Sequence, residues 1–307
     1  MTFLTLLLLA AGTTAGMYVS GGRELREGVE AQESIIYQGH TYERNDDVVA
    51  FMLLGFDGKR QSKGHPGQLD TMIIVALDTG NGSVHAISVP RDSMVDIPVL
   101  LDGVQVSERY AQLCLAYAYG GGDELGVYIT SESMSQLLAG VRVRSYYMLN
   151  YKGLSPMNDA MGGVTLTPLE TIPGTDIVEG KQITLKGEDA EQYIRWRNHT
   201  AYTASLDRQA RQVQYLKELV LQLSQEIRRN PMVAFDVLDA GKEYMRTNLD
   251  MAEWIYILGK ALTVDFGSLE MTTLPGTMGN DGTYAQFHVD EDAVERIILD
   301  TFYTRVG

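Results

Sequence analysis

Charged residues border three short apolar runs between Phe51 and Asp92. The charged residues concerned are Asp57, Lys59, Arg60, Asp70, Arg91 and Asp92. Short β-rich runs bounded by Gly, Asn or Pro predict buried strands. If these strands lie in one sheet, acids and bases gather at one of its edges. That composition suits a metal ion together with a phosphate.

Asp57 and Asp70 are the candidate metal ligands. Mg²⁺ is typically held by one or two carboxylates together with waters and substrate phosphates. The alternative is that both are ordinary acids at strand ends. His65 and His85 have no partner at a zinc-ligand spacing, which argues against zinc. No G-x-S-x-G, Walker A or G-x-G-x-x-G motif occurs in the chain.

A second stretch, residues 195–212, reverses the charge balance of the chain. Its basic and amide side chains of interest are Arg195, Arg197, Arg208, Arg211 and Gln212, and its one acid is Asp207. Arg208 and Gln212 share a helix face because they are four residues apart. Arg195 and Arg197 share a face only if the backbone there is extended. Arginine binds phosphate through bidentate, charge-assisted hydrogen bonds. The alternative is a solvated, basic helix start.

The elements that would position these residues form a mixed α/β pattern. The expected strands are 48–54, 72–77, 84–89, 143–149 and 164–167, with a hairpin turn at 78–82 and loops at 57–68, 96–105 and 172–188. The expected helices are 111–122, 132–139, 154–161, 189–196, 206–229, 250–262 and 291–302, the last with Asp290 as N-cap. Residues 48–307 are therefore predicted to form one three-layer α-β-α domain with a central mixed sheet.

Composition limits the possible partners. The 307 residues carry a formal net charge of −15, and 45% are hydrophobic. A substantial core is thus expected, whereas binding to nucleic acid, which needs a basic face, is not. The single cysteine, Cys114, excludes an intrachain disulfide, and its apolar neighbours predict an inert buried thiol.

The first 22 residues contain no charged side chain. Their length and apolar character predict a single-pass membrane anchor. A cleaved signal peptide is the competing interpretation, and a buried N-terminal helix of a cytoplasmic protein is the third. Residues 23–47 are polar and mixed in charge, which predicts a stalk that is partly helical over 23–34.

Taken in order, these motifs resemble the LytR-CpsA-Psr family of cell-wall glycopolymer transferases. The segments that carry the resemblance are 53–57 (LLGFD), 69–72 (LDTM), 88–92 (SVPRD), 116–121 (AYAYGG), 159–164 (DAMGGV), 195–197 (RWR) and 207–212 (DRQARQ). The resemblance covers roughly residue 48 to the C-terminus.

The resemblance implies transfer of a glycopolymer, of teichoic acid or capsule type, from undecaprenyl pyrophosphate to the C6 hydroxyl of muramic acid in peptidoglycan. The implied metal is Mg²⁺ on Asp57 and Asp70, and Arg91 is the expected catalytic arginine. An acid near the acceptor hydroxyl would assist its deprotonation, and Asp92 and Asp70 are the two candidates. The implied pyrophosphate-binding residues are Lys59, Arg60, Arg91, Arg195, Arg197, Arg208 and Gln212. It also implies an extracellular domain on a membrane anchor.

Five positions depart from the family pattern. Lys59 and Gln68 stand where an arginine is usual, Gln112 stands where a lysine is usual, and Cys114 stands where an asparagine is usual. Ser205 stands where an acid is usual, although Asp207 lies nearby. Lysine keeps the charge but loses the bidentate fork of arginine. These departures leave a second function open, in which the protein binds lipid-linked glycan or cell wall without turning it over.

Overall fold

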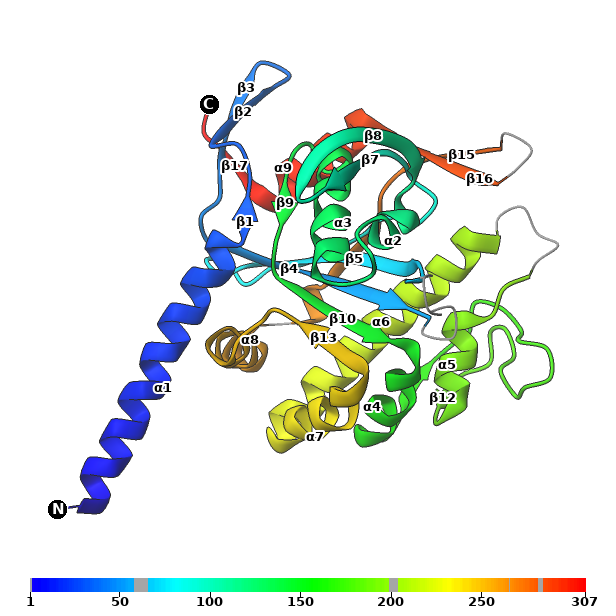
Figure 1. The fold of residues 1–307 in the computed structure, drawn as a ribbon. Helices are drawn as coiled ribbons and strands as arrows, with labels where there is room; N and C mark the ends of the chain where they lie inside the picture. The colour runs from blue at the N-terminus through cyan, green and yellow to red at the C-terminus, as the bar shows by residue number, and fades with distance from the viewer. Residues whose placement is uncertain (1, 58–65, 199–203, 265, 281–283) are drawn as a thin grey trace.

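The computed structural model describes residues 2–57, 66–198, 204–264, 266–280 and 284–307 (Figure 1). Its α-helices are α1 (Thr2–Glu27), α2 (Ala116–Tyr119), α3 (Glu124–Leu137), α4 (Leu154–Ala160), α5 (Glu188–Arg195), α6 (Ala204–Arg229), α7 (Met232–Gly241), α8 (Met251–Thr263) and α9 (Glu291–Phe302). Its strands are β1 (Val29–Glu30), β2 (Ser34–Tyr37), β3 (His40–Arg44), β4 (Val48–Phe56), β5 (Leu69–Asp78), β6 (Val84–Ser88), β7 (Met94–Leu101), β8 (Val104–Gln112), β9 (Arg142–Val143), β10 (Tyr146–Asn150), β11 (Val164–Leu166), β12 (Ile183–Leu185), β13 (Met245–Thr247), β14 (Glu270–Thr273), β15 (Gly276–Asn280), β16 (Ala285–Val289) and β17 (Tyr303–Arg305).

A six-stranded sheet in the order β13-β10-β4-β5-β6-β14 forms the centre of the fold. β4, β5 and β6 are antiparallel neighbours, β10 runs parallel to β4, and β14 runs parallel to β6. The sheet is therefore mixed, as predicted. The predicted hairpin turn between β5 and β6 is confirmed, and Gly82 there has a positive φ of 81°, which glycine adopts without steric cost.

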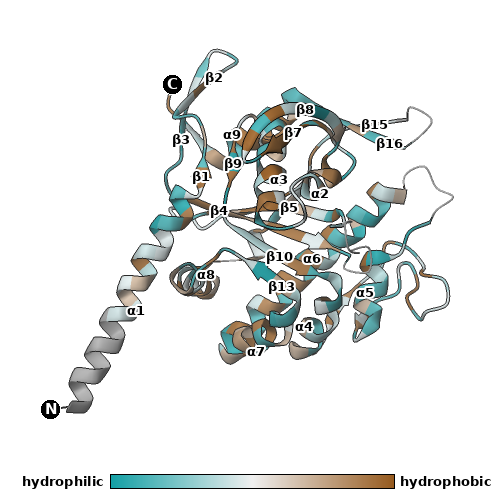
Figure 2. Cartoon of the chain, in the orientation of Figure 1, coloured by the Kyte–Doolittle hydropathy of each residue, from teal (hydrophilic) through white to brown (hydrophobic). Residues whose placement is uncertain are grey.

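Helices cover both faces of this sheet (Figure 1). On one face, Met52 and Leu54 of β4 belong to a buried cluster with residues of α3 and α9. On the other face, Leu53 of β4 lies in a cluster that includes Leu216 and Val220 of α6. The alternation follows from the two-residue period of a strand. Hydrophobic residues gather at α3 and in the sheet, between the layers (Figure 2).

The predicted loop at 96–105 is wrong, because β7 and β8 form an antiparallel hairpin there. Asp102 and Gly103 make its turn with positive φ values. From Val104 to Tyr110 every residue of β8 is exposed. Because this part of the strand has no buried face, its sequence lacks the alternation of apolar and polar residues by which a strand is predicted. The helix expected at 111–122 is wrong over most of its length, because β8 continues to Gln112 and the α-helix there is only α2 (Ala116–Tyr119). Other differences from the expected elements concern bounds: α3 begins at Glu124, β5 includes Asp70, the strand expected at 143–149 is broken into β9 and β10, and the loop expected at 172–188 contains β12. Helix α7 and strands β13 to β17 were not predicted from the sequence.

The segment expected to be a polar stalk is folded onto the domain. α1 ends at Glu27, and β1 then pairs with β9, while β3 pairs with both β2 and β17. The helix expected over 23–34 is thus wrong beyond Glu27, because backbone pairing with distant strands overrides local helix propensity. Across the part of the chain that is described, no helix combines the length and hydropathy that a membrane crossing needs.

Candidate functional site

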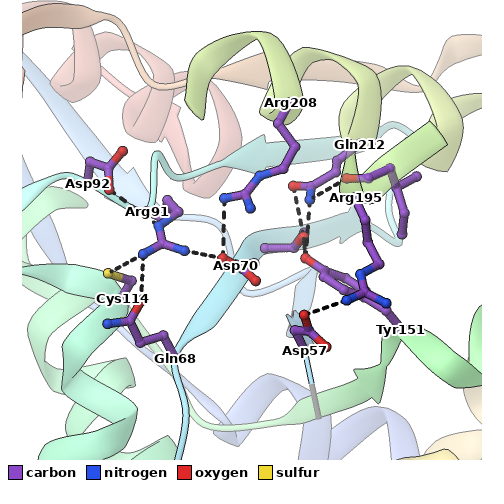
Figure 3. A network of polar contacts seen from close by, with 12 residues as sticks. Asp57, Gln68, Asp70, Arg91, Asp92, Cys114, Tyr151, Arg195, Arg208 and Gln212 are labelled. Atoms are coloured by element: carbon purple, nitrogen blue, oxygen red, sulfur yellow. Dashed lines mark hydrogen bonds and ion pairs between the residues drawn. The ribbon is translucent and has the colours of Figure 1, made fainter. Parts of the chain in front are cut away.

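Most of the predicted site residues converge at one edge of the central sheet (Figure 3). They come from the end of β4, the start of β5, the segment after β6, the end of α5 and the first turns of α6. The residues in this cluster are Asp57, Asp70, Arg91, Asp92, Arg195, Arg208 and Gln212. We call this set the arginine–aspartate cluster.

Asp70 is the centre of the cluster. Its Oδ1 forms a short ion pair with Nη1 of Arg91 and lies 3.2 Å from Nη2 of Arg208. Asp70 and Arg208 are buried, with 6% and 4% of their surfaces exposed. Nε of Arg208 has no hydrogen-bond partner among the described residues, and Nη2 makes this ion pair without an aligned hydrogen bond. A buried guanidinium with such unused donor capacity is poised to accept an anionic ligand.

Arg91 is held from several sides. Its Nη2 donates to Oε1 of Gln68 at 2.8 Å and contacts Sγ of Cys114 at 3.1 Å, while its Nε lies 3.3 Å from Oδ1 of Asp92. Gln112 donates to the same oxygen of Asp92 at 2.9 Å. Arg91 is thus fixed in place, and Asp92 is bound between Arg91 and Gln112.

The pKa values of Arg91 and Cys114 depend on this contact. Burial alone would lower the pKa of Arg91. The opposite effect of the neighbouring Cys114, Asp70 and Asp92 is larger, so the pKa of Arg91 lies above its usual value. Burial raises the pKa of the Cys114 thiol to about 11, against an opposing effect of Arg91. The thiol is therefore neutral at pH 7, and the carboxylates are the groups that stabilise the guanidinium charge.

Arg195 connects Asp57 to the end of α5. Its Nη2 lies 2.6 Å from Oδ2 of Asp57, and its Nη1 forms a short ion pair with Glu191. Trp196, the C-cap residue of α5, has an extended backbone (φ −55°, ψ 142°). Arg197 is the next residue, and it is half-buried. Lys59 and Arg60, which were expected to bind pyrophosphate, lie outside the described residues.

Gln212 connects α6 to β5 and to the segment after β10 through hydrogen bonds. Oγ1 of Thr71 donates to its Oε1 at 2.9 Å, and its Nε2 donates to the hydroxyl of Tyr151 at 3.2 Å and to the carbonyl of Ile194 at 3.2 Å. Gly55 permits this approach, because a Cβ there would lie 2.8 Å from the ring of Tyr151. Burial raises the pKa of Tyr151, so it remains a neutral phenol.

Sequence reasoning missed Gln68, Gln112 and Tyr151 as parts of the site. In the sequence, Gln68 and Gln112 stand out only as departures from the family pattern, and Tyr151 carries no local signal. Their roles depend on contacts across 20 to 80 positions of the chain, which spacing in a sequence does not reveal. The charged residues of the cluster were predictable, because they lie at the ends of predicted strands or at the start of a predicted helix.

An apolar cavity of about 280 Å³ lies between the sheet and helices α6, α7 and α8. Its lining includes Leu25, Phe51, Leu53, Val75, Leu216, Val220, Val237, Trp254 and Tyr256. On α6, Arg208, Gln212, Leu216 and Val220 follow one another at four-residue spacing and so share a face. At 1.5 Å per residue, Val220 lies about 12 Å along the helix from Gln212. One helix face therefore runs from the arginine–aspartate cluster into the cavity.

These features define a mixed-sheet α/β protein with a buried arginine–aspartate cluster beside an apolar cavity. The chain belongs to the LytR-CpsA-Psr family, because the model of the LytR_cpsA_psr family matches residues 17–300.

Relatives carry names from cell-wall assembly. The chain is 28% identical over 215 residues to polyisoprenyl-teichoic acid–peptidoglycan teichoic acid transferase TagU of Oceanobacillus iheyensis, covering 68% of this chain and 61% of that protein. It is 25% identical over 302 residues to TagU of Enterococcus faecalis, covering 96% and 91%. It is also 25% identical over 249 residues to TagV of Bacillus subtilis, covering 77% and 59%.

Solved structures share the fold. The crystal structure of B. subtilis TagV superposes with a TM-score of 0.63 at 20% identity, covering 83% of this chain and 95% of that chain. The structure of TagT bound to LI-WTA superposes with a TM-score of 0.64 at 19% identity, covering 88% and 95%. The predicted α/β fold with a central mixed sheet is thereby confirmed.

Proposed function

We propose that this protein is a glycopolymer transferase that moves a teichoic acid or capsule-type polymer from undecaprenyl pyrophosphate to the C6 hydroxyl of muramic acid in peptidoglycan. The observation that carries the proposal is the face of α6 on which Arg208 and Gln212 continue into Leu216 and Val220. A polyprenyl pyrophosphate has the same order of parts, an anionic head and a long apolar chain. The names of the relatives support the glycopolymer and the acceptor.

In the proposed reaction, the acceptor hydroxyl attacks the phosphorus that carries the glycopolymer. An oxygen–phosphorus bond forms to the acceptor, the bond to the bridging oxygen breaks, and undecaprenyl phosphate leaves with the electron pair. Arg91, Arg195 and Arg208 would stabilise the charge that develops on the phosphate oxygens, which is most of what phosphoryl transfer requires. We assign acceptance of the hydroxyl proton to Asp92, which is 5% exposed and contacts Arg91.

The donor chemistry at this edge of the sheet fits Mg²⁺. Asp57 and Asp70 are two buried carboxylates, and hard oxygen ligands of this number are what Mg²⁺ takes beside substrate phosphates. The ion pairs with arginine engage Oδ2 of Asp57 and Oδ1 of Asp70. When bound there, Mg²⁺ would neutralise phosphate charge and favour departure of the leaving group. Asp57 and Asp70 would hold the ion, and Arg91, Arg195 and Arg208 would orient the pyrophosphate.

We further propose that the domain lies on the outer side of the cell membrane, with residues 1–22 as its anchor. α1 begins in this uncharged segment and packs against α8, which also lines the apolar cavity (Figure 1). The prenyl chain would then enter close to the bilayer. Protease treatment of intact protoplasts tests this arrangement, because digestion of the domain is expected and full protection would contradict it.

Binding without turnover is the second function, and one contact favours it. Arg91 is already occupied by Asp70, Gln68 and Cys114, and two of these three are departures from the family pattern. An arginine that is satisfied within the protein has less hydrogen-bonding capacity for a phosphate.

Cleavage of a polyprenyl-pyrophosphate-linked glycan by the purified full chain separates these functions. We expect Mg²⁺-dependent release of polyprenyl phosphate that falls at least about 100-fold in Arg91→Ala. Arg229→Ala is the matched control, because Arg229 lies on α6 with a side chain that is 70% exposed. Wild-type cleavage no greater than that of Arg91→Ala, with donor binding retained, would leave only the binding function.

A further inference from the structure

A hollow of about 500 Å³ lies beside the arginine–aspartate cluster, on the outer side of α5. Its lining includes Ile172, Pro173, Glu188, Gln192, Arg195 and Trp196. The volume lies within the range of about 300–1,000 Å³ that is common for small-molecule sites. Apolar and aromatic surface combined with a few polar groups is also the usual make-up of such sites. We call it the Trp196 hollow.

Trp196 is held in this hollow by a buried arginine. The guanidinium of Arg211 lies 5.2 Å from the ring centroid of Trp196, and its Nη2 donates to the carbonyl of Trp196. Its Nε donates to the carbonyl of Tyr193 at 3.0 Å, and its Nη1 pairs with Glu170. Arg211 is among the largest fully buried side chains. Burying a charge is costly unless it is paired, so the indole and the end of α5 are firmly positioned.

Arg195 connects the Trp196 hollow to the cluster. One of its terminal nitrogens, Nη1, pairs with Glu191, which also lines the hollow. The other, Nη2, lies 2.6 Å from Oδ2 of Asp57. A single guanidinium therefore has one terminal nitrogen on each side. A ligand in the hollow and a phosphate bound at the cluster would therefore be separated by the side chain of Arg195 alone.

The chemistry of the hollow selects among ligands. Glu188 and Gln192 are exposed at its rim, and the positive charge of Arg195 is already paired with Glu191 and Asp57. A polyphosphate chain would meet uncompensated carboxylate charge here. A neutral sugar ring would instead place its apolar face on the indole and its hydroxyls on the carboxylate and amide oxygens.

We propose that the Trp196 hollow is a saccharide subsite, which binds the neutral sugar ring next to the reacting phosphate. The proposal rests on the proposed transferase function for the identity of that phosphate, but saccharide binding can be measured without turnover. Trp196 forms the platform, Gln192 and Glu188 receive the hydroxyls, and Arg211 is a positioning residue for Trp196. The sugar belongs either to the glycopolymer donor or to the peptidoglycan acceptor, which have this chemistry in common.

The two tryptophans of the chain allow a direct test. In Trp254→Phe, Trp196 is the sole tryptophan, and we expect a saturable change in its fluorescence on titration with N,N′-diacetylchitobiose. Gln192→Ala in this background should weaken binding about five- to tenfold, as expected for one lost hydrogen bond. Gln225→Ala, an exposed glutamine on α6, is the matched control and should leave the affinity unchanged.

Kinetics of transfer distinguish the source of the sugar. If Gln192→Ala raises KM for the lipid-linked donor alone, the subsite holds the donor sugar; if it raises KM for the peptidoglycan acceptor alone, it holds the acceptor sugar. No saturable fluorescence change, or equal affinity in Gln192→Ala and Gln225→Ala, would overturn the subsite. Saccharide binding in a protein that cleaves no donor would refute the transferase function and leave the subsite standing.

Discussion

Replacing Arg208 by methionine should barely change the stability of the fold, although Arg208 is a buried charge. Methionine fills a similar elongated volume without polar atoms. Arg208 lies 3.2 Å from Oδ1 of Asp70 but shares this oxygen with Arg91. Its Nη2 therefore gains one attraction, the guanidinium is repelled by that of Arg91, and its Nε has no hydrogen-bond partner among the described residues.

The magnitudes of these effects nearly cancel. An ion pair at 3.2 Å is worth about 5 kcal/mol at an effective dielectric constant of about 20. The one buried donor without any partner, Nε, costs about 1–3 kcal/mol, and both the desolvation of the guanidinium and its repulsion from Arg91 act in the same direction. We expect Arg208→Met to change the free energy of unfolding by no more than about 1 kcal/mol. Asp70→Asn should instead cost about 3–5 kcal/mol, because it leaves Arg208 without a carboxylate and Arg91 with Asp92 as its remaining one.

Urea denaturation followed by circular dichroism measures both changes. Arg229→Met is the control, because its side chain is 70% exposed, and it should stay within about 0.5 kcal/mol of the wild type. Under the proposed function, donor cleavage by Arg208→Met falls at least about 100-fold. A loss of stability in Arg208→Met as large as that in Asp70→Asn would refute the reasoning.

Three further predictions concern other parts of the molecule. Burial raises the pKa of Glu253, so its ionised form, present above that pKa, disfavours the folded state. Glu253→Gln should therefore raise the melting temperature at pH 7. This gain in melting temperature should shrink as the pH falls through the raised pKa, because the wild-type carboxyl then becomes neutral. A gain that grows towards low pH would contradict this. Cys114 is fully buried and has a pKa raised to about 11, so intact-mass analysis should find almost no alkylation by iodoacetamide at pH 8 until denaturant is added; rapid labelling of the native protein would argue against the placement. A Cβ on Gly21 would lie 2.1 Å from the carbonyl oxygen of Ala252, whereas one on Gly16 would meet nothing within 4 Å. In thermal unfolding, Gly21→Leu should lower the free energy of unfolding by about 1–3 kcal/mol, and Gly16→Leu should leave it unchanged. Equal effects of the two substitutions would exclude close packing of α1 against α8.

Amphipathic elements with clear caps were predictable from the sequence. The structure confirms α9 with Asp290 as its N-cap, and α6 begins two residues before its expected start. Both helices bury one face, so their apolar residues repeat at helical spacing. The β7–β8 hairpin lacked any such signal, because its outer strand is exposed along most of its length.

The candidate site was predictable where charge stood next to an element end. Asp57, Arg91 and Arg208 all met that condition, and contacts bring them to one edge of the sheet. Their metal-binding, catalytic and phosphate-binding roles stay predictions. Tyr151 and Gln112 were not identifiable, because each acts through a partner that only the folded chain brings near.

The docking of α1 determines where the chain can be shortened. Leu25 is fully buried and lines the apolar cavity, and β3 supplies the pairing partner of the C-terminal strand β17. A recombinant fragment that starts at the first strand of the central sheet would therefore lose Leu25 from the lining of the cavity and expose the edge of β17 at the opposite terminus. Removing only residues 1–16 would retain Leu25 and all of β3. The first 47 residues are thus two regions for protein production, one that can be removed and one that the fold requires.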